Sequence, residues 1–154
     1  MRSLFLFLAL LCWQTAGAQA PQARVTGVWV RATVPGQQAT GAFMTLESDV
    51  PLKLIEVRSP LAAAAEIHET RVDDDGVMRM RAIPQLDLPA GKTTQLKPGG
   101  HHIMLLGLKA QAKAGEQTTL TLVLEDAARQ RREIVADAPI RALNAPHQHG
   151  EPMR

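Results

Sequence analysis

Short runs of β-prone residues, separated by turn signals, most constrain the fold of this chain. Glycine, proline or aspartate clusters separate most runs, and several runs alternate between apolar and polar residues. No segment has the periodicity of a long helix, and residues 62–65 are at most a single helical turn. We therefore predict an all-β, antiparallel Greek-key sandwich or barrel. The predicted strands are 22–34, 41–47, 52–59, 66–72, 77–83, 93–96, 101–108, 118–125 and 132–136.

The first residues of the chain are typical of a secretory signal peptide. After a positively charged start, Leu4–Cys12 is apolar but too short to span a bilayer, and small residues follow at 15–20. We expect cleavage after Ala18. Cleavage after Ala20 fits the same rule but would leave Pro21 at the new N-terminus. The sequence thus predicts a signal peptide at 1–18 and an exported protein.

Composition bounds the function of the exported part. Cleavage would remove the only cysteine, so neither a free thiol nor a disulfide is expected. The remaining length suits one domain, which we place at 22–143, followed by a flexible, polar tail at 144–154. The 17 Lys and Arg residues nearly balance 15 Asp and Glu, and no basic run has aromatic neighbours. Nucleic acid is therefore not an expected partner.

An acidic turn joins two of the predicted strands. Asp73–Asp75 followed by Gly76 is typical of a β-hairpin. A three-residue turn at Asp73–Asp75, with Gly76 in a left-handed bulge, would place His68 opposite Met80 on one face. A four-residue turn would set His68 opposite Arg81 and move Met80 to the other face. We predict the three-residue turn because Gly76 stands where a bulge favours glycine.

Four donor side chains are candidates for a metal site: His68, Met80, His102 and Met104. His102 and Met104 share a face because side chains alternate along a strand. Thioether sulfur is soft and neutral, and it binds Cu(I) far better than it binds Zn, Mg or Ca, while imidazole tolerates both copper oxidation states. Two of each would form a neutral, near-tetrahedral shell suited to Cu(I). The lack of a cysteine ligand argues against a blue-copper site.

Packing roles compete with this hypothesis. A methionine in a strand is usually a core residue, and a lone histidine is often a surface or core residue, so the spacing alone leaves both readings open. Met78 is the alternative ligand to Met80, but we interpret it as a hydrophobic wall of the site. His101 should face away from the site, toward solvent. Glu66 shares the face of His68 and is either an acceptor that orients the imidazole or a simple surface carboxylate.

The run HETRVDDDGVMRMRAI, followed by LPAGKTTQLKPGGHHIMLLGLK, resembles the periplasmic copper chaperone family PCu(A)C over about residues 25–140. The family motif is His-x10-Met-x21-His-x-Met. Met80, His102 and Met104 fit it, whereas eleven residues separate His68 from Met80. Thr70 stands where the family often has another methionine. The resemblance implies a cupredoxin-like Greek-key barrel, a periplasmic location and Cu(I) binding by the four candidate residues.

The resemblance also implies a carrier rather than an enzyme. Its role would be delivery of copper to the dinuclear centre of cytochrome c oxidase, with the copper-bearing subunit or a Sco-type chaperone as partner. A histidine-brace oxygenase needs an N-terminal histidine, which neither Gln19 nor Pro21 supplies, and no Ser/His/Asp arrangement is evident. A copper-storage or tolerance protein and a non-catalytic extracellular binding module remain the alternatives.

The tail is a separate candidate site. His147, His149 and Met153 lie within residues 144–154. Histidine-containing tracts bind Cu(II) or Zn. Similar tails occur in the PCu(A)C family, so the resemblance implies a second, Cu(II)-preferring site here. The alternative is a solvated tail in which the histidines have no role.

Overall fold

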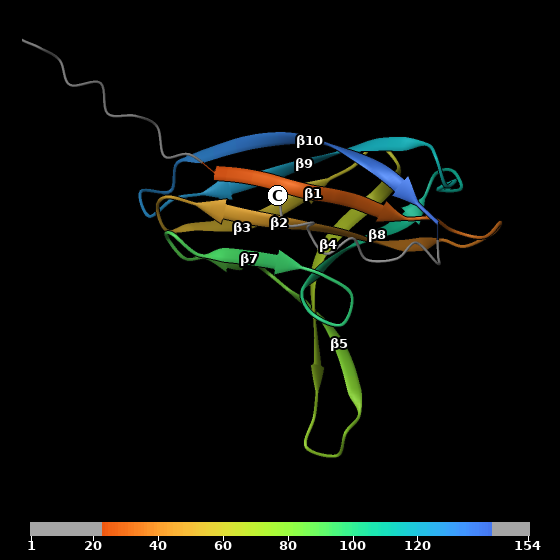
Figure 1. Ribbon diagram of the computed structural model, residues 1–154, viewed down its shortest axis with the longest axis horizontal. Coiled ribbons are helices and arrows are strands. Elements are labelled where there is room, and N and C mark those ends of the chain that lie inside the picture. Colours follow the sequence, from red (N-terminus) through yellow and green to blue (C-terminus); the bar gives the residue numbers. More distant parts are fainter. Residues whose placement is uncertain (1–22, 143–154) are drawn as a thin grey trace, which may run out of the picture.

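The computed structural model describes residues 23–142, which contain ten strands and no helix (Figure 1). Consequently, no membrane-crossing helix occurs within this range. The predicted signal peptide and the tail site lie outside the described residues. The strands are β1 (Ala23–Arg31), β2 (Ala39–Ser48), β3 (Leu52–Arg58), β4 (Ala62–Val72), β5 (Met78–Ile83), β6 (Leu86–Leu88), β7 (Thr93–Leu96), β8 (His102–Leu108), β9 (Gln117–Glu125) and β10 (Arg131–Arg141).

The strands form one hydrogen-bonded path that folds over on itself. Their order is β5-β4-β8-β2-β1-β10-β9-β3-β6, and β7 pairs with β2. All these pairs are antiparallel except β1 with β10, where Val30 lies beside Ile140 and Arg31 beside Arg141. The predicted all-β Greek-key class is confirmed. The parallel pair is an addition that strand patterns alone do not reveal.

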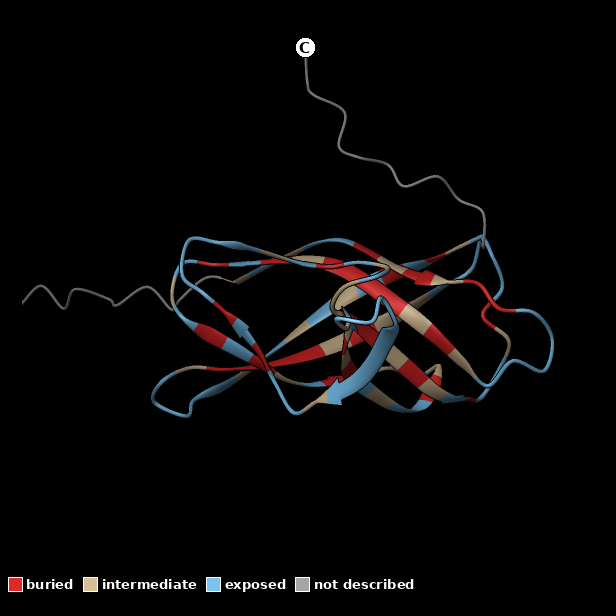
Figure 2. Ribbon diagram, turned by 90° about the horizontal axis from the view of Figure 1, so that it is seen from below, coloured by how far each residue is buried: buried red, intermediate tan, exposed pale blue. Residues whose placement is uncertain are grey.

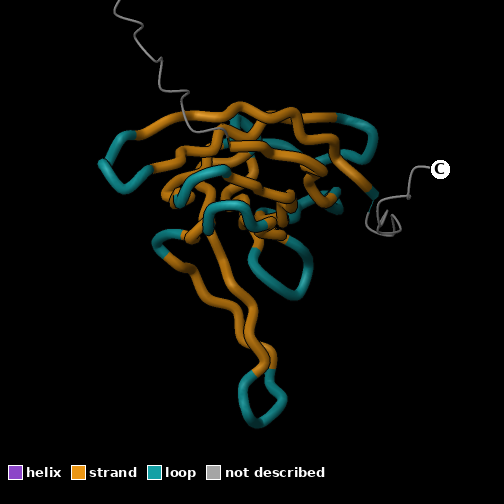
Figure 3. The backbone as a smooth tube through the Cα atoms, turned by 60° about the vertical axis from the view of Figure 1, so that its left-hand side comes forward, coloured by secondary structure: helices purple, strands orange, loops and turns teal. Residues whose placement is uncertain are grey.

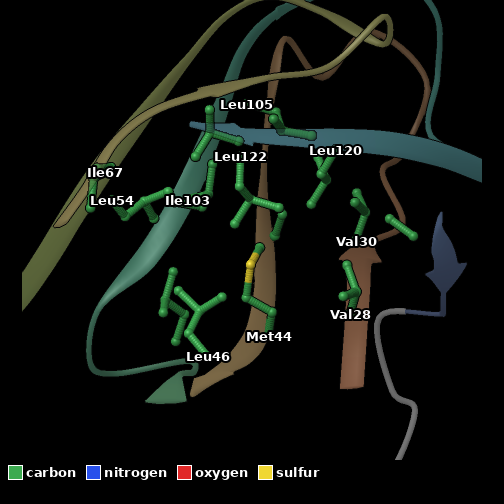
Figure 4. Close-up of a cluster of buried hydrophobic side chains, with 14 of the residues drawn as sticks. Val28, Val30, Met44, Leu46, Leu54, Ile67, Ile103, Leu105, Leu120 and Leu122 are labelled. Atoms are coloured by element: carbon green, nitrogen blue, oxygen red, sulfur yellow. The ribbon is translucent and has the colours of Figure 1, made fainter. Parts of the chain in front are cut away.

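Aliphatic side chains from β1, β2, β8 and β9 fill the core between the layers (Figure 4). Each of these strands turns alternate residues inward, and the inward positions are leucine, isoleucine, valine and methionine. Burial of this apolar surface is the main source of the fold's stability. The fully buried side chains include Val30, Leu46, Ile103, Leu105, Leu120 and Leu122.

Three strand assignments differ clearly from the sequence prediction, and one of them is β10, which was expected to end at 136 but runs to Arg141. Residues 62–65, expected to be at most a helical turn, begin β4 because Ala62 and Ala64 pair with Leu108 and Leu106 of β8. The short strand β6 was not predicted. Its three residues pair with β3, a long-range partner that a local pattern cannot reveal.

The β4–β5 hairpin projects from the body of the sandwich (Figures 1 and 3). Its predicted register was wrong by two residues, because His68 pairs with Ala82 and Met80 pairs with Thr70. An even shift preserves the face of every side chain. Met80 therefore stays on the face of His68, as a diagonal rather than a direct neighbour.

Hydrogen bonds of Asp73 explain the shifted turn. Its backbone N–H donates to the Val77 carbonyl at 3.0 Å, and its carboxylate Oδ1 accepts the Val77 N–H at 2.8 Å. These bonds leave a three-residue loop at 74–76 instead of 73–75. Gly76 has the expected left-handed backbone, with φ of 77°, but it lies inside the loop.

Candidate metal centre

The predicted ligands lie on the outer face of the sheet that contains β4 and β8. His68 pairs directly with His102, and Met104 follows His102 by two residues. Ile67, which precedes His68, and Ile103, which lies between His102 and Met104, are buried in the core, so the predicted ligands beside them point outward. The candidate methionine of β5 joins this face through the hairpin register.

A pocket of about 270 Å³ opens on this face. Three predicted ligands line it: Met80, His102 and Met104. Met78 lines it as well, which agrees with its interpretation as a wall residue. His68 is not among the lining residues, but its ring lies beside that of His102, with centroids 5.8 Å apart.

A backbone hydrogen bond orients His102. Its Nδ1–H donates to the Gly100 carbonyl at 3.0 Å, which leaves the lone pair on Nε2. The side chain is buried, and this burial lowers the pKa of His102. The Gly100 bond opposes the shift, whereas the nearby His68 and Arg31 add to it. Neutral imidazole is the form that binds metal, so this environment favours ligation.

His68 has one occupied and one free ring nitrogen. Its Nε2–H donates to Glu66 Oε2 at 2.8 Å, which decides between the two roles that the sequence left open for Glu66 in favour of an acceptor. Its Nδ1 is buried and has no hydrogen-bond partner among the described residues. A buried polar atom without a partner is costly unless something else binds it. The residues present therefore fit a metal ion that takes Nδ1 as a ligand.

The two hairpin methionines are exposed. Met78 and Met80 expose 65% and 55% of their surfaces, and every residue of β5 except Ile83 is exposed (Figure 2). Among the described residues, no group of three or more His, Cys, Asp or Glu could hold a metal. A metal site on this face would therefore depend on methionine sulfur.

The opposite face of the hairpin carries a different cluster. Glu69 is buried and accepts hydrogen bonds from Arg71 and Arg81. The bond from Arg81, followed by that from Arg71, lowers the pKa of Glu69 against the effect of burial. His101 lies 3.8 Å from the same carboxylate, so it faces away from the pocket, as expected, and is partly exposed.

Sequence reasoning missed the far wall of the pocket. Gly41 and Phe43 of β2 and Arg31 at the end of β1 line it. The Arg31 guanidinium carbon lies 5.4 Å from the Phe43 ring centroid, and Phe43 also packs on Trp29 at 4.5 Å. Alternation within β1 and β2 would have grouped these residues, but only the pairing of Gly41 with Met104 brings them to the site.

Similarity to known proteins supports the resemblance found in the sequence. A family described as "Putative lipoprotein LpqE-like" matches residues 23–136. A relative from Leifsonia xyli subsp. xyli, named "Putative lipoprotein Lxx21020", is 34% identical over 113 residues, which cover 73% of this chain and 68% of the relative.

Two solved structures support the fold assignment. The apo PCuAC domain from PmoF1 aligns with a TM-score of 0.65 and 28% identity, over 78% of this chain and 93% of that domain. The CuI form of DR1885 from Deinococcus radiodurans has a TM-score of 0.55 and 34% identity, over 82% of this chain and 83% of its own. The cupredoxin-like form of the Greek-key fold is thereby confirmed. This chain belongs to the LpqE-like family, which is the PCuAC family.

Proposed function

We propose that this protein binds one Cu(I) ion through His68 Nδ1, His102 Nε2 and the sulfurs of Met80 and Met104. The observation that carries the proposal is the buried, unpartnered Nδ1 of His68 beside a pocket lined by the other three donors. The copper(I) form of DR1885, which is 34% identical to this chain, supports the choice of metal.

The chemistry of the donors suits a carrier. All four are neutral and two are soft, so they match a monovalent d¹⁰ ion better than a hard divalent one. None is a thiolate, so the metal is held without the strong charge attraction that would slow its release. The exposed position of Met80 lets an acceptor approach the metal from the hairpin side and exchange ligands one at a time.

We propose delivery to another protein as the function, in the periplasm, after export by the signal peptide at 1–18. The acceptor is the copper-bearing subunit of cytochrome c oxidase, directly or through a Sco-type chaperone. Binding and exchange need no general acid or base, so we propose no enzymatic activity. Copper storage is the second candidate. It would leave the metal on this protein when the acceptor is present.

Anaerobic Cu(I) titration against a chromophoric chelator tests the site. The wild type should take up one tight equivalent, and His102→Ala or Met104→Ala should remove it. His101→Ala is the matched control, because that neighbouring imidazole faces Glu69 instead of the pocket. Tight binding that survives both ligand variants would refute the proposed site.

Mixing the loaded protein with the soluble copper domain of the oxidase subunit, alone or with a Sco-type protein, tests delivery. Transfer is followed by the visible spectrum of the dinuclear centre. Copper that stays on this protein in both mixtures would favour storage.

We also propose a second, Cu(II)-preferring site at His147, His149 and Met153. Deleting residues 144–154 should leave the Cu(I) equivalent intact and reduce Cu(II) uptake. Unchanged Cu(II) uptake after the deletion would show that the tail does not bind this ion.

A further inference from the structure

We propose that Arg31 sets the oxidation-state preference of the pocket by disfavouring Cu(II) relative to Cu(I). The inference rests on the proposed copper site and deepens it. Arg31 is not a ligand in this account. Its role is electrostatic, and it acts on whatever charge the metal brings into the pocket.

Arg31 lies in the same pocket as the ligands. It lines the cavity together with His102 and Met104, and in the strand order its strand β1 and the hairpin strand β5 lie on opposite sides of β8. Its guanidinium lies over Phe43, whose ring centroid is 6.3 Å from that of His102. Cation–π contact with an aromatic face holds a guanidinium in place and leaves its charge intact.

The charge of Arg31 is not neutralised within the pocket. Among the described residues that line it, Arg31 is the only lysine or arginine, and none is an aspartate or glutamate. The Arg31 Nε is buried without a hydrogen-bond partner. Glu66, the carboxylate that shares the face of His68, is engaged by His68 Nε2. The pocket therefore combines neutral donors with one uncompensated cation.

Coulomb repulsion from Arg31 disfavours the more highly charged oxidation state of copper. Copper brings one positive charge as Cu(I) and two as Cu(II), so the repulsion from a fixed guanidinium doubles on oxidation. At the separations found within one pocket, one extra unit of repulsion lowers Cu(II) affinity relative to Cu(I) roughly tenfold. Without Arg31, the same His and Met donors would hold Cu(II) more readily.

The reduction potential of the bound copper is the direct test. In Arg31→Gln the ratio of Cu(II) to Cu(I) affinity should rise roughly tenfold, which lowers the one-electron potential by about 59 mV. Arg31→Lys keeps the charge and should restore most of the wild-type potential. A merely structural role for Arg31 would not produce this rescue by charge.

Arg141 provides a matched control. It is the parallel-strand neighbour of Arg31 and stacks on Trp29 at 5.6 Å, but it does not line the pocket. Arg141→Gln should therefore shift the potential by less than half as much. Equal potentials in the wild type and Arg31→Gln, with one Cu(I) still bound, would overturn this inference alone. Failure of the wild type to bind Cu(I) would overturn the proposed function as well.

Discussion

The sandwich body and the β4–β5 hairpin are both built from β-strands, but they differ in how far their side chains are buried. In the body, side chains such as Leu105 and Leu122 are completely buried between two layers. In the hairpin, Val72 and Met80 are more than half exposed, and among the described strands β5 pairs only with β4. The body provides stability, whereas the hairpin displays side chains.

The proposed site straddles this boundary. His102 and Met104 belong to β8, which is flanked by β4 and β2 within the sheet. Met80 belongs to β5, the terminal strand of the hydrogen-bonded order. Two of the proposed donors are thus held by the core, and one depends on the terminal strand of the hairpin. We therefore expect the hairpin to open before the body unfolds, and we propose that it controls binding and release of the metal.

The largest expected effect separates the two regions by stability. Leu105→Ala should lower the free energy of unfolding by about 2–5 kcal/mol, because it leaves a cavity in the core. Val72→Ala in the hairpin should change it by less than about 0.5 kcal/mol. Urea denaturation followed by far-UV circular dichroism measures both. Equal losses would mean that the hairpin is part of the cooperative core.

Gly41 tests how the body shapes the pocket wall. A Cβ at this position would lie 2.8 Å from Phe43 Cζ, so Gly41→Ala should force the ring to move and cost about 1–3 kcal/mol. Gly100→Ala is the control, because its added Cβ would meet Lys97 Cγ at an ordinary 3.6 Å. Thermal unfolding measures both, and similar melting temperatures for the two variants would contradict the close packing.

The two hairpin methionines test which sulfur is the ligand. Met80→Ala should lower Cu(I) affinity roughly tenfold or more, since one of four donors is lost. Met78→Ala should change it by less than about threefold, because we interpret Met78 as a wall residue. Competition with a Cu(I) chelator measures both affinities. A larger loss for Met78→Ala would exchange the two roles.

Two buried carboxylates, one in the body and one at the hairpin root, test the difference between these regions through the pH dependence of stability. Glu125 lies at an end of the body and pairs with Arg131 and Arg129, much as Glu69 pairs with arginines at the hairpin root. The hydrogen bond from Arg131 is the main cause that lowers the Glu125 pKa below its ordinary 4.5. A lowered folded-state pKa stabilises the protein above 4.5, and this contribution disappears as the pH falls through the folded value.

Replacing Glu125 or Glu69 by glutamine should therefore change different measured quantities, global stability in the first case and local hydrogen exchange in the second. Glu125→Gln should flatten the acid-side fall in the unfolding free energy of the whole domain. Glu69→Gln should instead raise amide hydrogen exchange at the β4–β5 pairs, with little effect on global unfolding. If Glu69→Gln flattened the global curve equally, the hairpin would not open on its own.

The sequence predicted some parts of the site because they depend only on strand alternation. His102 and Met104 share a face in any strand that contains them, and both line the pocket. The hairpin register needed more information. It depends on the side chain of Asp73 accepting the Val77 N–H, a bond that turn propensities do not specify. The ligand roles of these residues stay predictions.

The remaining parts depend on contacts between distant segments. Arg31 reaches the pocket because β1 pairs with β2 and β2 pairs with β8, and β2 and β8 are far apart in the sequence. Long-range pairing of this kind requires the folded structure. The free Nδ1 of His68 depends instead on a local contact, because its other nitrogen bonds Glu66 two residues away, which strand alternation permits but does not specify.

Because the methionine sulfurs of the hairpin are exposed, oxidants in solution can reach them. An oxidant that converts Met80 to its sulfoxide replaces a soft sulfur donor by a hard, polar oxygen, which has little affinity for a monovalent soft ion. Met44, buried in the core, is shielded from the same reagent. We therefore expect peroxide to inactivate the proposed copper site while the domain remains folded, and methionine sulfoxide reductase chemistry to reverse the damage.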